Sequence, residues 1–115
     1  MEKNVKISML LNIYGKLLTE KQYESLDNYY NSDLSLSEIA ENMNITRQAV
    51  RDNIKKGENK LFEFEEKLEI MKRAVETDKK ISSILSELTK LETNSSDKQV
   101  QRVINHIMQE LSCLV

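Results

Sequence analysis

Proline and tryptophan are absent from this chain of 115 residues, and it contains only two glycines. Folds rich in β-sheet need many tight turns, and tight turns depend on glycine and proline. The sequence is rich instead in leucine, lysine and glutamate, which are strong helix formers. We therefore predict an all-α fold.

Cysteine is nearly absent as well, which limits disulfide and metal chemistry. The single cysteine, Cys113, cannot form an intrachain disulfide. It shares an expected helix with His106, but two ligands do not complete a zinc site. The N-terminus lacks the apolar core of a signal peptide, and no apolar run approaches the roughly 20 residues that span a bilayer. We expect a cytoplasmic protein with no metal, cofactor or membrane association.

Sequence signals of catalysis are missing too. The chain has no glycine-rich phosphate-binding loop. Its most closely spaced carboxylates are those of Glu63, Glu65, Glu66 and Glu69. They lie among Lys60, Lys67 and Lys72, a pattern typical of a solvated helix face stabilised by ion pairs. We therefore predict no catalytic residues and no enzymatic activity.

Tyr23, Tyr29 and Tyr30 allow two interpretations. Exposed aromatic rings can stack on the bases of a single-stranded nucleic acid. Apolar residues at helical spacing more often face a core, and the spacing of these tyrosines favours core positions.

An amphipathic helix is predicted at the N-terminus. Its apolar stripe consists of Val5, Met9, Leu10, Ile13 and Leu17. Gly15 interrupts the stripe, so the helix should end near Tyr14. Thr19 and Gln22 have the spacing of a capping box, which predicts the start of a second helix.

A helix-turn-helix is predicted next, in the segment LSEIAENMNITRQAVRDNIKK. Ser35 and Glu38 form a capping box for its first helix, and Asn44, which tolerates a left-handed backbone, should make the sharp turn. Thr46 can cap a second helix that begins at Arg47. The residues expected to point inward are Ile39, Ala40, Met43, Ile45, Val50 and Ile54.

The outward face of the second helix is locally basic, although the whole chain has a net charge of −2. In known complexes this helix enters the major groove with its N-terminal residues at base edges. Arg47 and Arg51 can bind guanine, and Gln48 can pair with adenine. The residues placed to contact phosphates are Ser37, Thr46, Lys55 and Lys56. A solvated face on a helix that binds only protein would look similar, and Asp52 lies within it.

Apolar residues recur at alternating three- and four-residue spacing from Leu61 onward. Such spacing produces the narrow apolar seams of coiled coils and antiparallel bundles. The register fails at Asp78, so we expect a bend or break near Glu76–Lys79. Ser96 and Gln99 have capping-box spacing and should open the last helix.

These seams could be buried in two ways. The last two helices could fold back on the domain, or they could pack against a second copy of the chain. The seams are long for so small a core, which favours a homodimer. The residues expected at the dimer interface are Ile84, Leu88, Leu91, Val100, Ile104, Ile107 and Leu111.

The stretch from Tyr14 to Leu68 resembles the YlxM family of small bacterial helix-turn-helix proteins. The phrases LLTEKQ, LSLSEIAE, ITRQAVRDNIK and FEEKL carry this resemblance. The stretch is more distantly similar to the DNA-binding region 4 of bacterial sigma factors, with Asn44 where glycine is usual. The YlxM resemblance implies a regulatory role in the signal recognition particle pathway. It also implies a nucleic-acid role for Arg47, Gln48, Arg51 and Lys55.

We therefore expect a helix-turn-helix domain in residues 1–60 and a helical extension in residues 61–115 that mediates dimerisation. The first hypothesis is a regulatory protein that binds double-stranded DNA and takes part in the signal recognition particle pathway. The alternative is an adaptor that binds the particle's protein or RNA without sequence-specific DNA binding. A third hypothesis is that the helix-turn-helix is a relic and the protein only assembles.

Overall fold

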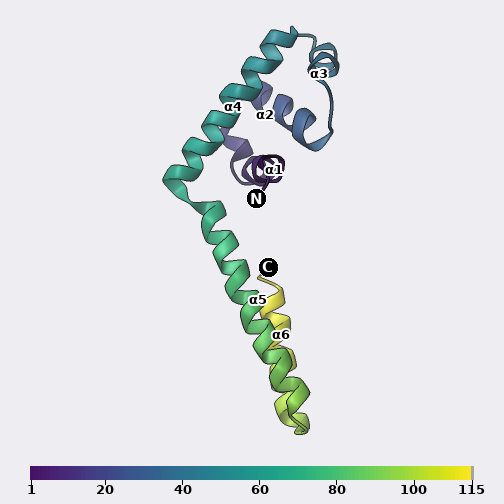
Figure 1. Ribbon diagram of the computed structural model, residues 1–115, viewed down its shortest axis with the longest axis vertical. Helices are drawn as coiled ribbons and strands as arrows, with labels where there is room; N and C mark the ends of the chain where they lie inside the picture. The colour runs from purple at the N-terminus through teal and green to yellow at the C-terminus, as the bar shows by residue number, and fades with distance from the viewer. Residues whose placement is uncertain (115) are drawn as a thin grey trace. The chain divides into compact units, whose positions relative to one another are not determined.

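The computed structural model describes residues 1–114, and within that range every regular element is helical. The helices are α1 (Lys3–Tyr14), α2 (Glu20–Leu26), α3 (Leu36–Met43), α4 (Arg47–Leu68), α5 (Ile70–Asn94) and α6 (Lys98–Ser112) (Figure 1). A 3₁₀ turn over Gly15–Leu17 follows α1, and a π-helical turn over Asp27–Asn31 follows α2. The predicted all-α fold is confirmed.

The chain divides into two compact units. Residues 1–71 form the first unit, and the second begins at Lys72. The boundary that we expected after residue 60 therefore falls within α4. The last turns of α4 belong to the first unit, where Leu61 is fully buried.

The predicted helix starts in the first unit are set by side-chain caps. Before α2, the Thr19 hydroxyl accepts from the Gln22 N–H at 3.2 Å, and the Gln22 side chain accepts from the Thr19 N–H. Ser35 and Glu38 make the same reciprocal pair before α3. Each box satisfies backbone donors that a helix start otherwise leaves unpaired.

The core of the first unit is built around α4, which packs against α1, α2 and α3 (Figure 1). The face that α1 buries differs from the predicted stripe. The buried residues of α1 are Ile7, Leu10, Leu11 and Tyr14. Val5 and Leu17 are 49% and 57% exposed. The buried face is rotated toward Tyr14 because the ring of Tyr14 packs inside, where its hydroxyl is hydrogen-bonded.

Gly57 allows α2 and α4 to approach closely. A Cβ at this position would lie 2.6 Å from Leu26 Cδ1 and 3.5 Å from Gln22 Cβ. Leu26 is fully buried, so its side chain has little space into which it could move. The missing side chain of Gly57 therefore sets the separation of these two helices.

The break that ends α4 lies at Glu69, and α5 continues without interruption to Asn94. Our prediction of a bend near Glu76–Lys79 is therefore wrong. The change of apolar register marks instead the passage from one core to the next, because Met71 is buried in the first unit and Ile81 in the second.

Side chains from distant parts of the first unit satisfy the backbone at this break. Glu69 has a left-handed backbone with φ 54° and ψ 30°. The Tyr14 hydroxyl accepts from the Ile70 N–H at 3.2 Å, and the Glu65 carboxylate accepts from the Met71 N–H at 3.0 Å. Tyr14 also donates to Glu65 at 2.7 Å, so the two caps support each other.

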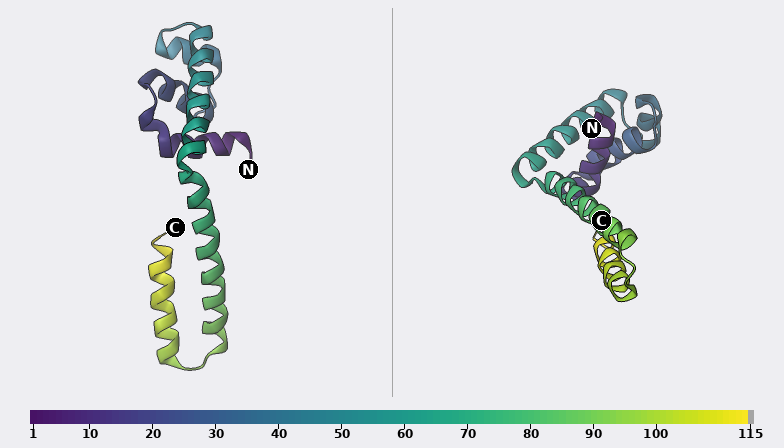
Figure 2. Two further views of the ribbon diagram at one scale, coloured as in Figure 1. Left: turned by 90° about the vertical axis from the view of Figure 1, so that its left-hand side faces the viewer. Right: turned by 60° about the horizontal axis from the view of Figure 1, so that its bottom comes forward.

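In the second unit, α5 and α6 form an antiparallel hairpin (Figure 2). The cap of α6 is Asp97, whose carboxylate accepts from the Gln99 N–H at 2.9 Å. The prediction of Ser96 as the cap is one residue off. A carboxylate at a helix N-terminus also interacts favourably with the helix dipole, which explains the preference for Asp97.

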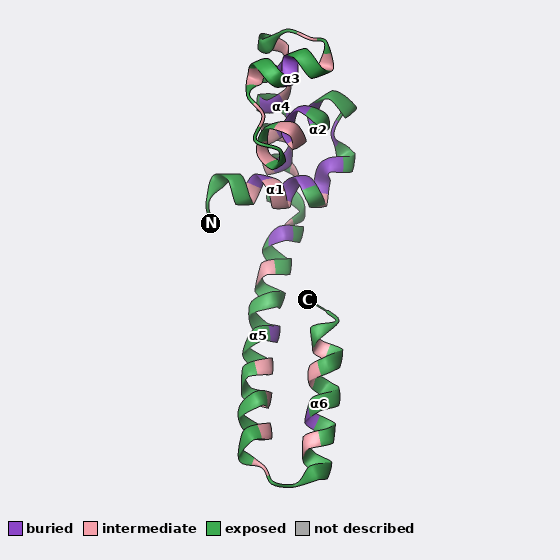
Figure 3. Ribbon diagram, turned by 90° about the vertical axis from the view of Figure 1, so that its right-hand side faces the viewer, coloured by how far each residue is buried: buried purple, intermediate pink, exposed green. Residues whose placement is uncertain are grey.

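The ribbons of α5 and α6 carry their buried and half-buried residues mainly on the sides that face each other (Figure 3). Ile81 and Ile104 are buried there, and Leu88 and Leu111 are half-buried. The predicted dimerisation set is thus divided, since Ile104, Leu88 and Leu111 close the hairpin itself. The exposed members of the set are Ile84, Leu91, Val100 and Ile107.

Candidate nucleic-acid interface

The helix-turn-helix consists of α3, a sharp turn at Asn44, and the first turns of α4. Asn44 has a left-handed backbone with φ 56° and ψ 45°, as predicted. The Ile45 N–H donates to the Ala40 carbonyl at 3.0 Å, which closes the end of α3. The Thr46 hydroxyl then accepts from the Ala49 N–H at 3.0 Å and caps α4. Local signals therefore fix where the second helix begins.

Apolar residues hold α4 against the rest of the unit and determine which side faces solvent. Ile39 and Val50 are fully buried, and Ala40 and Ile54 are nearly so. Met43 and Ile45 are half-buried. Val50 and Ile54 occupy the inner side of α4, so Gln48 and Asp52, each two residues from Val50, lie on the outer side.

All seven predicted nucleic-acid contacts are exposed on this motif. They are Ser37, Thr46, Arg47, Gln48, Arg51, Lys55 and Lys56. Arg47, Arg51 and Lys55 are four residues apart in succession, so they form one row along α4. The exposed carboxylates of α3, Glu38 and Glu41, make the first helix acidic by contrast. The positive charge of the motif is therefore concentrated on α4.

Asp52, the acidic residue within the basic face, has a defined partner. The Gln48 amide nitrogen donates to the Asp52 carboxylate at 3.1 Å. This bond uses one of two amide hydrogens of Gln48, and it leaves the amide oxygen and the second hydrogen available. Asp52 can thus orient Gln48 without blocking an acceptor-and-donor pair with a base edge.

The tyrosines do not follow the prediction of core positions. Tyr23 and Tyr29 are 42% and 39% exposed, and Tyr30 is half-buried. The Tyr30 hydroxyl donates to the Glu58 carboxylate, which also pairs with Lys3 at 3.5 Å. Burial of Tyr30, and then this carboxylate, raises its pKa. The π-helical turn displaces the rings of Tyr29 and Tyr30 from regular helical spacing, whereas Tyr23 lies before it in α2.

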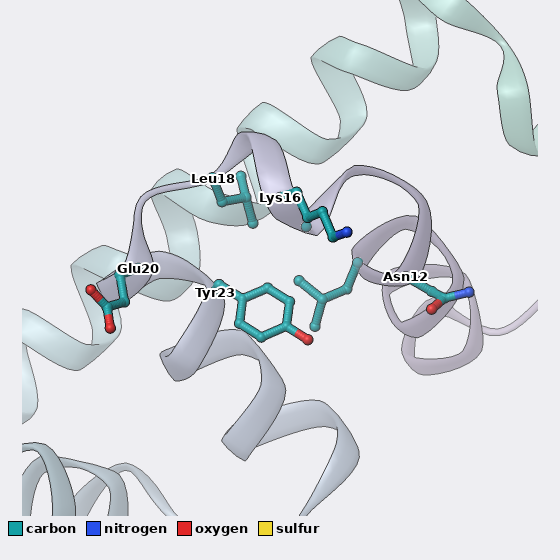
Figure 4. Close-up of a pocket in the computed structure, with 7 residues that line it drawn as sticks. Asn12, Lys16, Leu18, Glu20 and Tyr23 are labelled. Atoms are coloured by element: carbon teal, nitrogen blue, oxygen red, sulfur yellow. The ribbon is translucent and has the colours of Figure 1, made fainter.

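A shallow pocket of about 470 Å³ lies elsewhere in the first unit (Figure 4). Its lining residues come from α1, the 3₁₀ turn and the region of α2, and are Leu11, Asn12, Gly15, Lys16, Leu18, Glu20 and Tyr23. A Cβ on Gly15 would lie 2.7 Å from the Tyr23 ring, so glycine lets the ring close over the turn. The pocket shares no residue with the basic face of α4.

The described residues, 1–114, contain neither a metal-ligand group nor a membrane-spanning helix. No group of three His, Cys, Asp or Glu side chains there is arranged to hold a metal ion. His106 and Cys113 are both exposed. None of the helices in that range has the apolar length that crossing a bilayer requires.

Comparison with known proteins places this arrangement in a family. A model of the family described as "Putative helix-turn-helix protein, YlxM / p13 like" matches residues 1–112. The chain belongs to the UPF0122 family. This confirms the resemblance and the helix-turn-helix inferred from the sequence motifs.

Individual UPF0122 proteins match over most or part of the chain. The protein of Clostridium kluyveri is 42% identical over 113 residues, which cover 96% of this chain and all of that protein. The protein of Acetivibrio thermocellus is 36% identical over 115 residues, covering 100% of this chain and 98% of its own. The protein of Malacoplasma penetrans is 53% identical over 68 residues, 59% of this chain and 64% of its own.

Proposed function

We propose that this UPF0122 protein is a cytoplasmic regulatory protein that binds double-stranded DNA through α4. The observation that supports this most is the row of exposed cations on a helix that buried Val50 and Ile54 anchor to the core. Such anchoring presents the cations at a fixed angle, which groove recognition requires.

The residues of the row have distinct proposed roles. Arg47 and Arg51 reach guanine bases with bidentate hydrogen bonds, and Gln48, held by Asp52, pairs with adenine. The phosphate contacts are Ser37, Thr46, Lys55 and Lys56. The hydroxyl oxygen of Thr46 is occupied by the Ala49 N–H, so its own O–H is the group that donates to a phosphate.

The biological setting that we propose is the signal recognition particle pathway, as the resemblance to the YlxM family implies. As a homodimer, it would present two copies of α4 to half-sites separated by about 34 Å or a multiple of that distance. This separation corresponds to one turn of B-form DNA.

A second candidate function is an adaptor for the particle's protein or RNA. The net charge of −2 and the acidic face of α3 favour this alternative, because a general nucleic-acid binder carries a basic surface. The adaptor would use helical surfaces and would not read a DNA sequence.

Titration against duplex DNA and particle RNA at two salt concentrations separates the two functions. We expect duplex binding that weakens steeply with salt, by about 0.9 in log slope for each phosphate neutralised. Arg47→Ala and Arg51→Ala should each cost about 1–3 kcal/mol and relax specificity. Lys55→Ala should weaken all sequences alike.

The matched control is the double variant Lys79→Ala, Lys90→Ala, which removes two exposed cations from α5. It changes the net charge as much as the double variant Arg47→Ala, Arg51→Ala does. Equal losses of DNA affinity in the two double variants would show that net charge alone determines binding and would refute base reading by α4. Binding to RNA alone would favour the adaptor.

A further inference from the structure

The α5–α6 hairpin has too small a core to account for its apolar residues. Of the side chains from Lys72 to residue 114, only Ile81 and Ile104 are buried hydrophobic ones. Units of about 40 residues usually need a disulfide, a metal or association to be stable. Association is the factor that would also bury the apolar side chains that α5 and α6 leave exposed.

The uncovered apolar residues form a second stripe on each helix. On α6, Val100, Val103 and Ile107 are 42%, 55% and 39% exposed. With 100° of rotation per residue, this stripe is displaced by about 40–100° from buried Ile104. On α5, Ile84 and Leu91 are displaced from buried Ile81 by similar angles, and they are 43% and 58% exposed.

The two stripes lie on one face of the hairpin. Viewed along the chain from its N-terminus, each stripe is rotated in the same direction away from the buried residue of its helix, Ile81 or Ile104. Because α5 and α6 run antiparallel (Figure 2), rotations of the same sense along the chain point to the same side of the pair. The result is one apolar face, which we call the hairpin face and which consists of Ile84, Leu91, Val100, Val103 and Ile107.

We propose that the hairpin face packs against the same face of a second copy of the chain, forming an antiparallel four-helix bundle. This proposal rests on the homodimer of the proposed function and names the surface through which its two copies associate. The twofold axis runs parallel to the helices, so that α5 of one copy lies on α6 of the other.

The level of each residue along the hairpin supports this arrangement. The hairpin turns at about residue 96, between Asn94 and Lys98, so residues equally far from the turn lie at the same level. Ile84 is then level with Ile107 of the second copy, and Leu91 is level with Val100 and Val103. The apolar residues of one copy therefore meet those of the other.

Charges at the rim are complementary in the same arrangement. Lys80 borders the face on α5, and Glu110 borders it on α6. Both lie at nearly the same level from the turn, so each lysine is opposite a glutamate of the second copy. A pairing of α5 with α5 would not bring these charges together.

The available area also fits a second copy. The 15 residues of α6 span about 22 Å, and two helices packed side by side are about 20 Å wide. The hairpin face thus offers a flat footprint of at least roughly 440 Å², and α5 extends it. Side chains that project from the helices add to this flat area and bring it toward the roughly 800 Å² that each partner buries in a standard interface.

Sedimentation of the full chain without nucleic acid tests the interface independently of DNA binding. The wild type should have twice the mass of 13.4 kDa. Val103→Glu should return to the single mass, with the dissociation constant raised by more than about a hundredfold, because a charge would be buried without a partner. Gln109→Glu, which adds the same charge on the opposite side of α6, should stay dimeric.

Two further measurements keep the result unambiguous. Circular dichroism of Val103→Glu should retain at least the helix content of α1 to α4, because the substitution lies outside the first unit. Lys80→Glu should weaken the dimer, and adding Glu110→Lys should restore it. A monomeric wild type at about 100 μM, a dimeric Val103→Glu, or no restoration by the charge exchange would each overturn the proposal. A wild type that is dimeric but does not bind duplex DNA would contradict only the proposed function.

Discussion

Replacing Glu65 by alanine should reduce the free energy of unfolding of the first unit by about 2–4 kcal/mol. Its carboxylate accepts from the Tyr14 hydroxyl at 2.7 Å and from the Met71 N–H at 3.0 Å. Hydrogen bonds to a charged group each contribute roughly 1.5–3 kcal/mol. Partial exposure of Glu65 lowers the sum, whereas Tyr14 is only 1% exposed and its hydroxyl cannot easily bind water instead.

Urea unfolding followed by circular dichroism measures this loss. Glu65→Gln keeps an acceptor oxygen and should retain more than half of the stability that Glu65→Ala loses. Glu66→Ala is the control, because it removes a neighbouring exposed carboxylate from the same helix. An ordinary surface substitution changes the free energy of unfolding by up to about 0.5 kcal/mol. If the losses in Glu65→Ala and Glu66→Ala differ by no more than this, the hydrogen bonds at Ile70 and Met71 do not stabilise the break between α4 and α5.

Substitutions at two other positions test the left-handed backbone of Asn44 and the half-buried phenol of Tyr30. Asn44→Ala should lower the free energy of unfolding by about 1 kcal/mol, because alanine lacks the short polar side chain that lets asparagine tolerate the left-handed backbone. Asn44→Gly should not, and equal urea midpoints for the two variants would contradict this account. The raised pKa of Tyr30 means that unfolded chains lose the Tyr30 proton near pH 10 while folded chains keep it. Stability should therefore fall above about pH 10, and less steeply in Tyr30→Phe when urea midpoints are compared at about pH 9 and 11.

The helix-turn-helix could be predicted in detail because its signals are local. Thr46 caps the helix that begins at the next residue, and Asn44 makes the turn two residues earlier. Each signal depends on side chains within a few positions of the backbone group that it satisfies. The outward positions of Gln48 and Asp52 follow from the burial of Val50, because residues two apart on a helix are about 200° apart.

The break at Glu69 could not be predicted because its cause is distant in the sequence. Glutamate rarely adopts a left-handed backbone, and nothing near Glu69 resembles a cap. The groups that satisfy the following turn include the Tyr14 hydroxyl from α1. Periodicity also could not determine how the C-terminal seams are divided, because residues that close the hairpin and residues on its open face both recur every three or four positions.

The uninterrupted course of α4 has a consequence for how this family can change in length. Arg47 at its start and Leu61 deep in the core belong to one helix, with Gly57 fixing the approach of α2 between them. One inserted residue before Gly57 would rotate the basic row by about 100° relative to the core and displace it by about 1.5 Å. Insertions and deletions should therefore accumulate in the connections, such as residues 95–97, while the distance from Arg47 to Gly57 stays constant.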